Sequence, residues 1–75
     1  MMNMTAGIWK ITNYYNRIQA WREWQALAQT AVCQGMGDLV EEHKPSEGAS
    51  WKEIDRKINQ LRDAMQKRDY ETVGY

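Results

Sequence analysis

Few residues of this 75-residue chain are of the types that carry out chemistry, and none stands in a catalytic pattern. His43 is the only histidine and lies beside Lys44 and Pro45, in a predicted loop. We expect it to be an exposed loop residue, because a nucleophile needs a base held within hydrogen-bonding reach. Cys33 is the only cysteine. Its place on the apolar margin of a long predicted helix favours a buried thiol that acts as a small hydrophobe.

The acidic residues and the glycines do not form a recognisable site either. Two sets of carboxylates could be considered as candidate catalytic pairs, Asp55 with Asp63 and Glu41 with Glu42. Charges at such spacings usually form a solvated helix face. The glycines of Gly35-Met36-Gly37 lack the preceding strand and the third glycine of a phosphate-binding loop. The sequence therefore predicts a protein that is not an enzyme, with no cofactor and no metal site.

Length and charge narrow the class of protein further. A domain of this size buries only about 60% of its unfolded-chain surface, so stability should depend on oligomerisation or a large partner. Ten basic and ten acidic residues cancel to a formal net charge of zero, which removes the field that draws proteins to nucleic acid. We find no leader pattern and no apolar run near the ~20 residues of a membrane span. A cytoplasmic-type protein without membrane contact is expected.

The clearest predicted element is a helix over residues 50–68. Ser50 as N-cap with Glu53 three residues later makes a capping box. One apolar stripe at helical spacing follows, and we expect its residues in the core. They are Trp51, Ile54, Ile58, Leu61 and Met65.

A longer helix is predicted over residues 8–34, ending at a left-handed cap formed by Gly35 or Gly37. Its expected core residues are Ile11, Tyr14, Ile18 and Val32. The apolar arc continues past them, to Trp24, Leu27 and Ala31 on one side and to Tyr15 and Cys33 on the other. This arc is wider than one short helix can cover, so part of it should face a partner.

The remaining residues are predicted as a loop and a tail. Residues 35–49 form the loop; within them, 38–42 fit a helical turn, a short strand or an irregular segment, and we prefer the helical turn. Residues 69–75 lose the helical period and favour an extended tail, which is either frayed or a hook onto another subunit. The expected fold is all-α, or nearly so: a single domain over 1–75, with an antiparallel two-helix hairpin, a loop around 38–49 and an extended C-terminal tail.

Contacts with partners are expected from the aromatic residues. Four tryptophans in so short a chain suggest a large contact surface, because tryptophan is enriched at binding hot spots. The predicted interface residues are Trp21, Trp24, Leu27, Tyr70, Val73 and Tyr75. Nucleic-acid binding is disfavoured because Glu53, Asp55 and Asp63 are interspersed among the cations of the second helix.

The run from 50 to 75, Ser-Trp-Lys-Glu-Ile-Asp-Arg-Lys-Ile-Asn-Gln-Leu-Arg with a tail ending Val73-Gly74-Tyr75, resembles part of a phage protein family. It is similar to the second helix and tail of the small gpW-like head-to-tail joining proteins of tailed phages. Residues 20–35 also resemble their first helix and its exit. Residues 38–49 depart from the family, because they lack its alternating hairpin residues and contain Pro45.

The resemblance implies a virion connector subunit that forms a homo-oligomeric ring and docks on a portal or tail protein through the first helix and the tail. The alternative is a small inhibitor or antitoxin-like module, encoded by a phage or bacterium, that binds a host protein in the cytoplasm through the Trp21 and Trp24 side. A helical DNA-binding protein is the third possibility.

Overall fold

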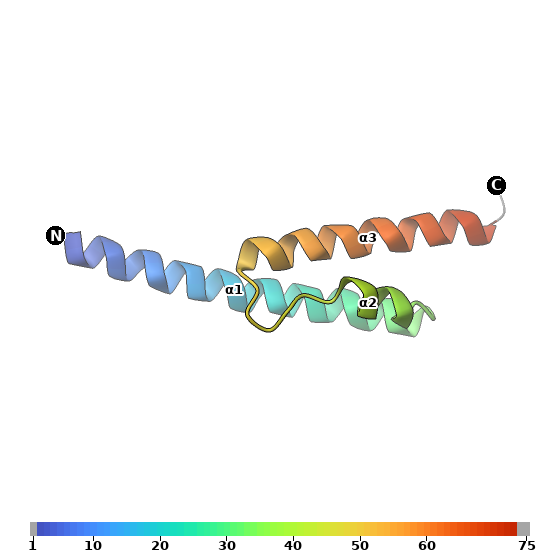
Figure 1. Cartoon of the computed structure of the whole chain (residues 1–75), viewed down its shortest axis with the longest axis horizontal. Coiled ribbons are helices and arrows are strands. Elements are labelled where there is room, and N and C mark those ends of the chain that lie inside the picture. The colour runs from blue at the N-terminus through green and yellow to red at the C-terminus, as the bar shows by residue number, and fades with distance from the viewer. Residues whose placement is uncertain (1, 74–75) are drawn as a thin grey trace.

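The computed structural model describes the backbone of residues 2–73 and the side chains of residues 11–71. It contains three helices, α1 (Met2–Cys33), α2 (Gly37–His43) and α3 (Trp51–Val73), and no strand within the described residues (Figure 1). The predicted all-helical class is confirmed. α1 starts earlier than the predicted residue 8, and Gly7 lies inside it.

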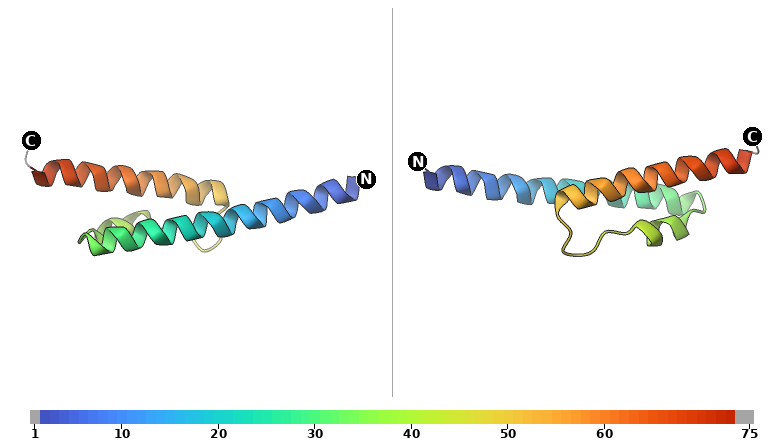
Figure 2. Two further views of the ribbon diagram at one scale, coloured as in Figure 1. Left: turned by 180° about the vertical axis from the view of Figure 1, so that it is seen from behind. Right: turned by 45° about the horizontal axis from the view of Figure 1, so that its top comes forward.

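The two long helices run parallel, so the predicted antiparallel hairpin is wrong. The start of α3 lies beside the first half of α1, where Trp51 Nε1 donates a hydrogen bond to Asn13 Oδ1 at 3.1 Å. The other end of α3 reaches the start of α2, where Arg68 bonds to Asp38. α2 and the following loop carry the chain back along α1 before α3 begins (Figures 1 and 2).

The core lies between α1 and α3, with α2 closing one side. Its buried residues are Ala20, Trp24, Ala31, Met36, Leu39, Ala49, Ile54, Ile58, Leu61 and Met65. Four of the five predicted stripe residues of α3 are therefore confirmed as buried, and Trp51 is half-buried against the same cluster. α1 contributes Ala20, Trp24 and Ala31 to this cluster.

α1 ends at a glycine cap, as the sequence predicted. Gly35 has a φ of 79°, a left-handed conformation that costs other residues energy. The Met36 N–H bonds to the Ala31 carbonyl at 2.8 Å and the Gly35 N–H bonds to the Val32 carbonyl at 3.0 Å. This pair of bonds is a Schellman motif, which brings Met36 under the helix end and into the core.

Residues 37–43 form α2, so this part of the loop predicted over 35–49 is helical instead. The preferred helical turn within 38–42 is what the structure contains. Burial of Leu39 explains why so short a helix forms, since packing rather than propensity stabilises such elements. Pro45 ends it by holding Lys44 in an extended conformation, with φ −57° and ψ 126°.

α3 begins as predicted but ends later. The Ser50 hydroxyl accepts a hydrogen bond from the Glu53 N–H at 3.3 Å, which confirms Ser50 as a helix cap. The helix continues to Val73, so an end at Arg68 and an extended segment over 69–73 are both wrong. Each added residue of an existing helix gains a backbone hydrogen bond, and no glycine or proline interrupts the chain between Gly48 and Gly74. Residues 74 and 75 lie outside the described residues.

The molecule is elongated, about 60 × 20 × 15 Å. Its radius of gyration of 15.9 Å exceeds the roughly 11 Å expected for a compact chain of this length. Figure 1 shows the reason: the first part of α1 projects past the start of α3 without another helix beside it. We call residues 2–12 of α1 the arm.

Candidate interaction surface

The most exposed apolar side chains of α1 gather where the arm joins the body. Ile11 is 70% exposed, Tyr14 66% and Tyr15 60%, and Ile18 one turn later is half-buried. Single exposed apolar residues are common on protein surfaces, but neighbouring ones of this size mark interaction sites. We call Ile11, Tyr14, Tyr15 and Ile18 the outward face of α1.

The outward face and the core face lie on different sides of the same helix. At about 100° per residue, Ile11, Tyr15 and Ile18 fall within roughly 60° of one another. Ala20, Trp24 and Ala31, which pack against α3, are centred almost opposite. α1 therefore has two apolar faces, and the body of the protein covers one of them.

This division corrects the predicted core of α1. Ile11, Tyr14 and Val32 were expected inside, but Val32 is 58% exposed and the other two are on the outward face. Ile18 is half-buried, on the outward face. The helical period shows which residues share a face, and it does not say which of two apolar faces the rest of the chain will cover.

The predicted interface residues are scattered in the structure. Trp24 is 4% exposed and belongs to the core, so it is not available for a partner. Trp21 and Leu27 are half-buried and pack against the same core. Tyr70 is 71% exposed near the end of α3, far along the molecule from the arm. The side chain of Val73 and the whole of Tyr75 lie outside the described residues.

Two contacts that sequence reasoning missed position the outward face. Arg17 donates from Nε to the Ala49 carbonyl at 3.0 Å and from Nη2 to the Glu47 carbonyl, so it anchors the loop before α3. Together with the bond from Trp51 to Asn13, this anchor fixes where α3 begins on α1. Arg17 carried no sequence signal, since its partners are backbone carbonyls about thirty residues away.

A bidentate ion pair holds the opposite end of the body. Arg68 Nη1 and Nη2 lie 2.8 Å from Asp38 Oδ1 and Oδ2, which joins α3 to the first turn of α2. The hydrogen bond from Arg68 lowers the pKa of the Asp38 carboxyl. The same bond raises the pKa of the Arg68 guanidinium. Both side chains are partly exposed, so salt will screen the attraction.

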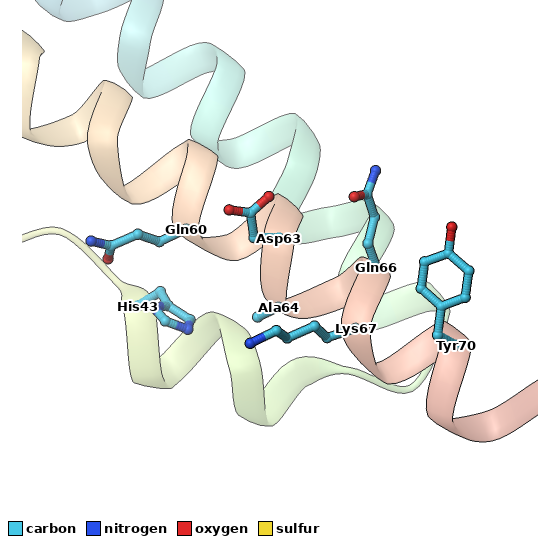
Figure 3. Close-up of a pocket in the computed structure, with 7 residues that line it drawn as sticks. All are labelled: His43, Gln60, Asp63, Ala64, Gln66, Lys67 and Tyr70. Carbon is cyan, nitrogen blue, oxygen red and sulfur yellow. The ribbon is translucent and has the colours of Figure 1, made fainter. Parts of the chain in front are cut away.

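A shallow groove of about 410 Å³ runs between α2 and α3. Figure 3 shows its lining: His43 from the end of α2, and Gln60, Asp63, Ala64, Gln66, Lys67 and Tyr70 from α3. His43 was expected in a loop and exposed, but it ends α2 and is half-buried. The groove is open to solvent, and its lining combines amide, basic and acidic side chains with Ala64 and the ring of Tyr70.

Cys33 also differs from expectation, because it is exposed at the last residue of α1 and not buried on an apolar margin. Within residues 11–71 no three histidine, cysteine or acidic side chains come together to hold a metal ion. No helix in the described part of the chain is long and apolar enough to cross a membrane.

The chain was compared with models of known protein families, with curated proteins and with solved structures, and none of the three comparisons found a match.

Proposed function

We propose that this protein is a structural interaction subunit, which works by docking the outward face of α1 onto another helix. The observation that carries the proposal is the exposure of Ile11, Tyr14 and Tyr15 on the side of α1 away from α3. Tyrosine is enriched among the residues that dominate binding energy. A rigid helix also loses little conformational entropy when it binds, which favours affinity.

The arm adds reach and a positive charge to this surface. Lys10, Arg17 and Arg22 are the charged residues of the first 22, and the first acidic residue is Glu23. Residues 23–75 hold the other seven basic residues and all ten acidic ones, and 7 − 10 gives −3 against +3 for residues 1–22. The first 22 residues of this neutral chain therefore carry only positive charge, which favours an acidic partner surface for this part of α1.

The narrower proposal is a subunit of the head-to-tail connector of a tailed phage. It is supported by the resemblance of residues 50–75 to gpW-like proteins and by the uncovered apolar face that a ring neighbour could bury. In this proposal, α2 takes the place that a β-hairpin has in that family.

The alternative, an inhibitor acting through Trp21 and Trp24, loses its main contact because Trp24 is buried. Native mass spectrometry of the purified chain, alone and mixed with the portal protein of a tailed phage, tests the proposed role. We expect a ring or a portal complex from the natural sequence, and its loss in Ile11→Glu.

The matched control is Gln29→Glu, which adds the same charge at an exposed position roughly five turns past the arm. It should assemble as the natural sequence does, and circular dichroism should show both variants to be helical. Assembly of Ile11→Glu at natural levels would refute docking through the outward face. A one-to-one complex with a host enzyme would favour the inhibitor instead.

A further inference from the structure

A short segment covers one side of the core between the two long helices. We call residues 34–46, which include α2, the strap. Its buried residues are Met36, Leu39 and Pro45, and α2 itself contributes only Leu39. The rest of the core comes from α1, from α3 and from Ala49. The long helices therefore pack against each other, and the strap covers one side of that contact (Figure 2).

α2 has little stability of its own. Its seven residues are too few for a helix to form alone in water. No side chain caps its first turn with a hydrogen bond, since the residue at the cap position is Met36. What keeps α2 on the body is the burial of Leu39 and the ion pair between Asp38 and Arg68.

The ion pair connects the start of α2 to the far end of α3. Both terminal nitrogens of Arg68 lie 2.8 Å from the carboxylate oxygens of Asp38. Glu42, one turn later on α2, and Glu71 on α3 also attract this guanidinium. The two paired side chains are partly exposed, so their charges are solvated when the pair separates. Such a pair breaks at small cost, and its strength depends on salt.

The strap is long enough to leave the body while both of its ends stay in place. One end follows Cys33, and the other is fixed by Arg17, which bonds to the Glu47 and Ala49 carbonyls. Arg17 and Cys33 lie about 24 Å apart along α1, at about 1.5 Å per residue. Residues 34–46, fully extended, span about 45 Å. The strap can therefore move away without displacing α3 from α1.

We propose that the strap opens as a unit while α1 and α3 stay paired, and that the ion pair between Asp38 and Arg68 latches it closed. Opening exposes one side of the apolar core to solvent, and closing covers it again. Local opening of this kind is expected where few apolar contacts hold a segment. The latch does not depend on what docks on the outward face, because the strap packs against the core.

Native-state hydrogen exchange of the full chain, followed by NMR, tests whether the strap opens separately. The amides of residues 41–43 report on α2, and those of Ile58 and Leu61 report on the contact between α1 and α3. Ile54→Val weakens that contact in the first turn of α3, whereas the groove with α2 begins at Gln60.

We expect Ile58 and Leu61 to exchange about two- to tenfold faster in Ile54→Val. Residues 41–43 should exchange at their natural rate, because the contact between α1 and α3 persists when the strap opens. Equal acceleration of the two sets would show that α2 opens only when the whole chain unfolds, and would overturn the proposal.

Arg68→Gln tests the latch, since it removes the ion pair without changing α2. We expect residues 41–43 to exchange about two- to fivefold faster at low salt. High salt should accelerate them in the natural chain and have little effect in the variant. Arg62→Gln is the control, because it removes the same charge from an exposed position whose bond is to Asn59 of the same helix. Equal exchange of 41–43 in Arg68→Gln and Arg62→Gln would show that the pair is not a latch.

Discussion

Trp51 Nε1 and Asn13 Oδ1, from residues 38 apart in the sequence, are joined by a 3.1 Å hydrogen bond between the first residue of α3 and the first half of α1. This bond sets how far along α1 the second long helix begins. α3 starts beside Asn13, so residues 2–12 project as the arm (Figure 1). The length of the arm is thus a consequence of the register between the two parallel helices.

A double-mutant cycle on this pair measures how strongly the register is held. Trp51→Phe, Asn13→Ala and the double variant are compared by urea denaturation. A half-buried side-chain hydrogen bond contributes about 0.5–1.5 kcal/mol, and we expect a coupling energy in that range. A coupling indistinguishable from zero would mean that packing alone positions the start of α3.

Replacing Gly35 should destabilise the turn between α1 and α2. Gly35→Ala forces a side chain into the left-handed region, at a cost of about 1–2 kcal/mol. A Cβ at Gly35 would meet nothing within 4 Å, so the cost is conformational and not steric. Gly48→Ala is the control, because its site is equally open and its φ is not positive. Equal denaturation midpoints for the two variants would show that the cap is not strained.

Truncating the centre of the α3 stripe should nearly unfold the chain. Leu61 has no exposed surface, and Leu61→Ala in such a site costs about 2–5 kcal/mol. Gln66→Ala, at an exposed position of the same helix, should change stability by less than about 0.5 kcal/mol. Thermal unfolding followed by circular dichroism checks both. A small effect for Leu61→Ala would mean that the contact between α1 and α3 is not the main source of stability.

The ion pair between Asp38 and Arg68 should make the folded chain less stable as the pH falls into the acid range. The pKa of Asp38 is below its usual value of 3.8 in the folded chain, so the unfolded chain binds the proton more tightly. The pair therefore contributes stability above pH 3.8, and this contribution is lost as the pH falls through the lower folded pKa.

Melting temperatures of the natural chain and Asp38→Asn, measured from pH 7 to pH 2, test that sign. The natural chain should melt higher at neutral pH, and the two should converge in acid. High salt should reduce the difference at pH 7, since both side chains are partly exposed. A difference that is the same at every pH would contradict a role for the ionised carboxylate.

The parts of the fold that local chemistry determines could be predicted from the sequence. The single stripe of α3, the Ser50 cap and the Gly35 cap each follow from residue type and spacing within a few positions. These features depend on neighbours in the chain, so no knowledge of the tertiary structure was needed.

The orientation of the helices and the accessible part of α1 could not be predicted in the same way. The parallel arrangement depends on α2 and on the bonds of Arg17 to backbone carbonyls, which leave no pattern in the sequence. Trp24 and Tyr15 are both large and aromatic, and only the position of α3 buries one and exposes the other. The tail prediction failed because weak extended propensities at 70–73 did not outweigh continuation of an existing helix.

Hydroxyl-radical footprinting of the tyrosines, in the dilute chain and in its assembled form, tests the central claim most directly. Tyr14, Tyr15 and Tyr70 are all exposed in the single chain and should react there. Docking through the outward face predicts that Tyr14 and Tyr15 become protected on assembly. Protection of Tyr70 alone, with Tyr14 and Tyr15 reacting as before, would place the contact at the end of α3 and contradict the account.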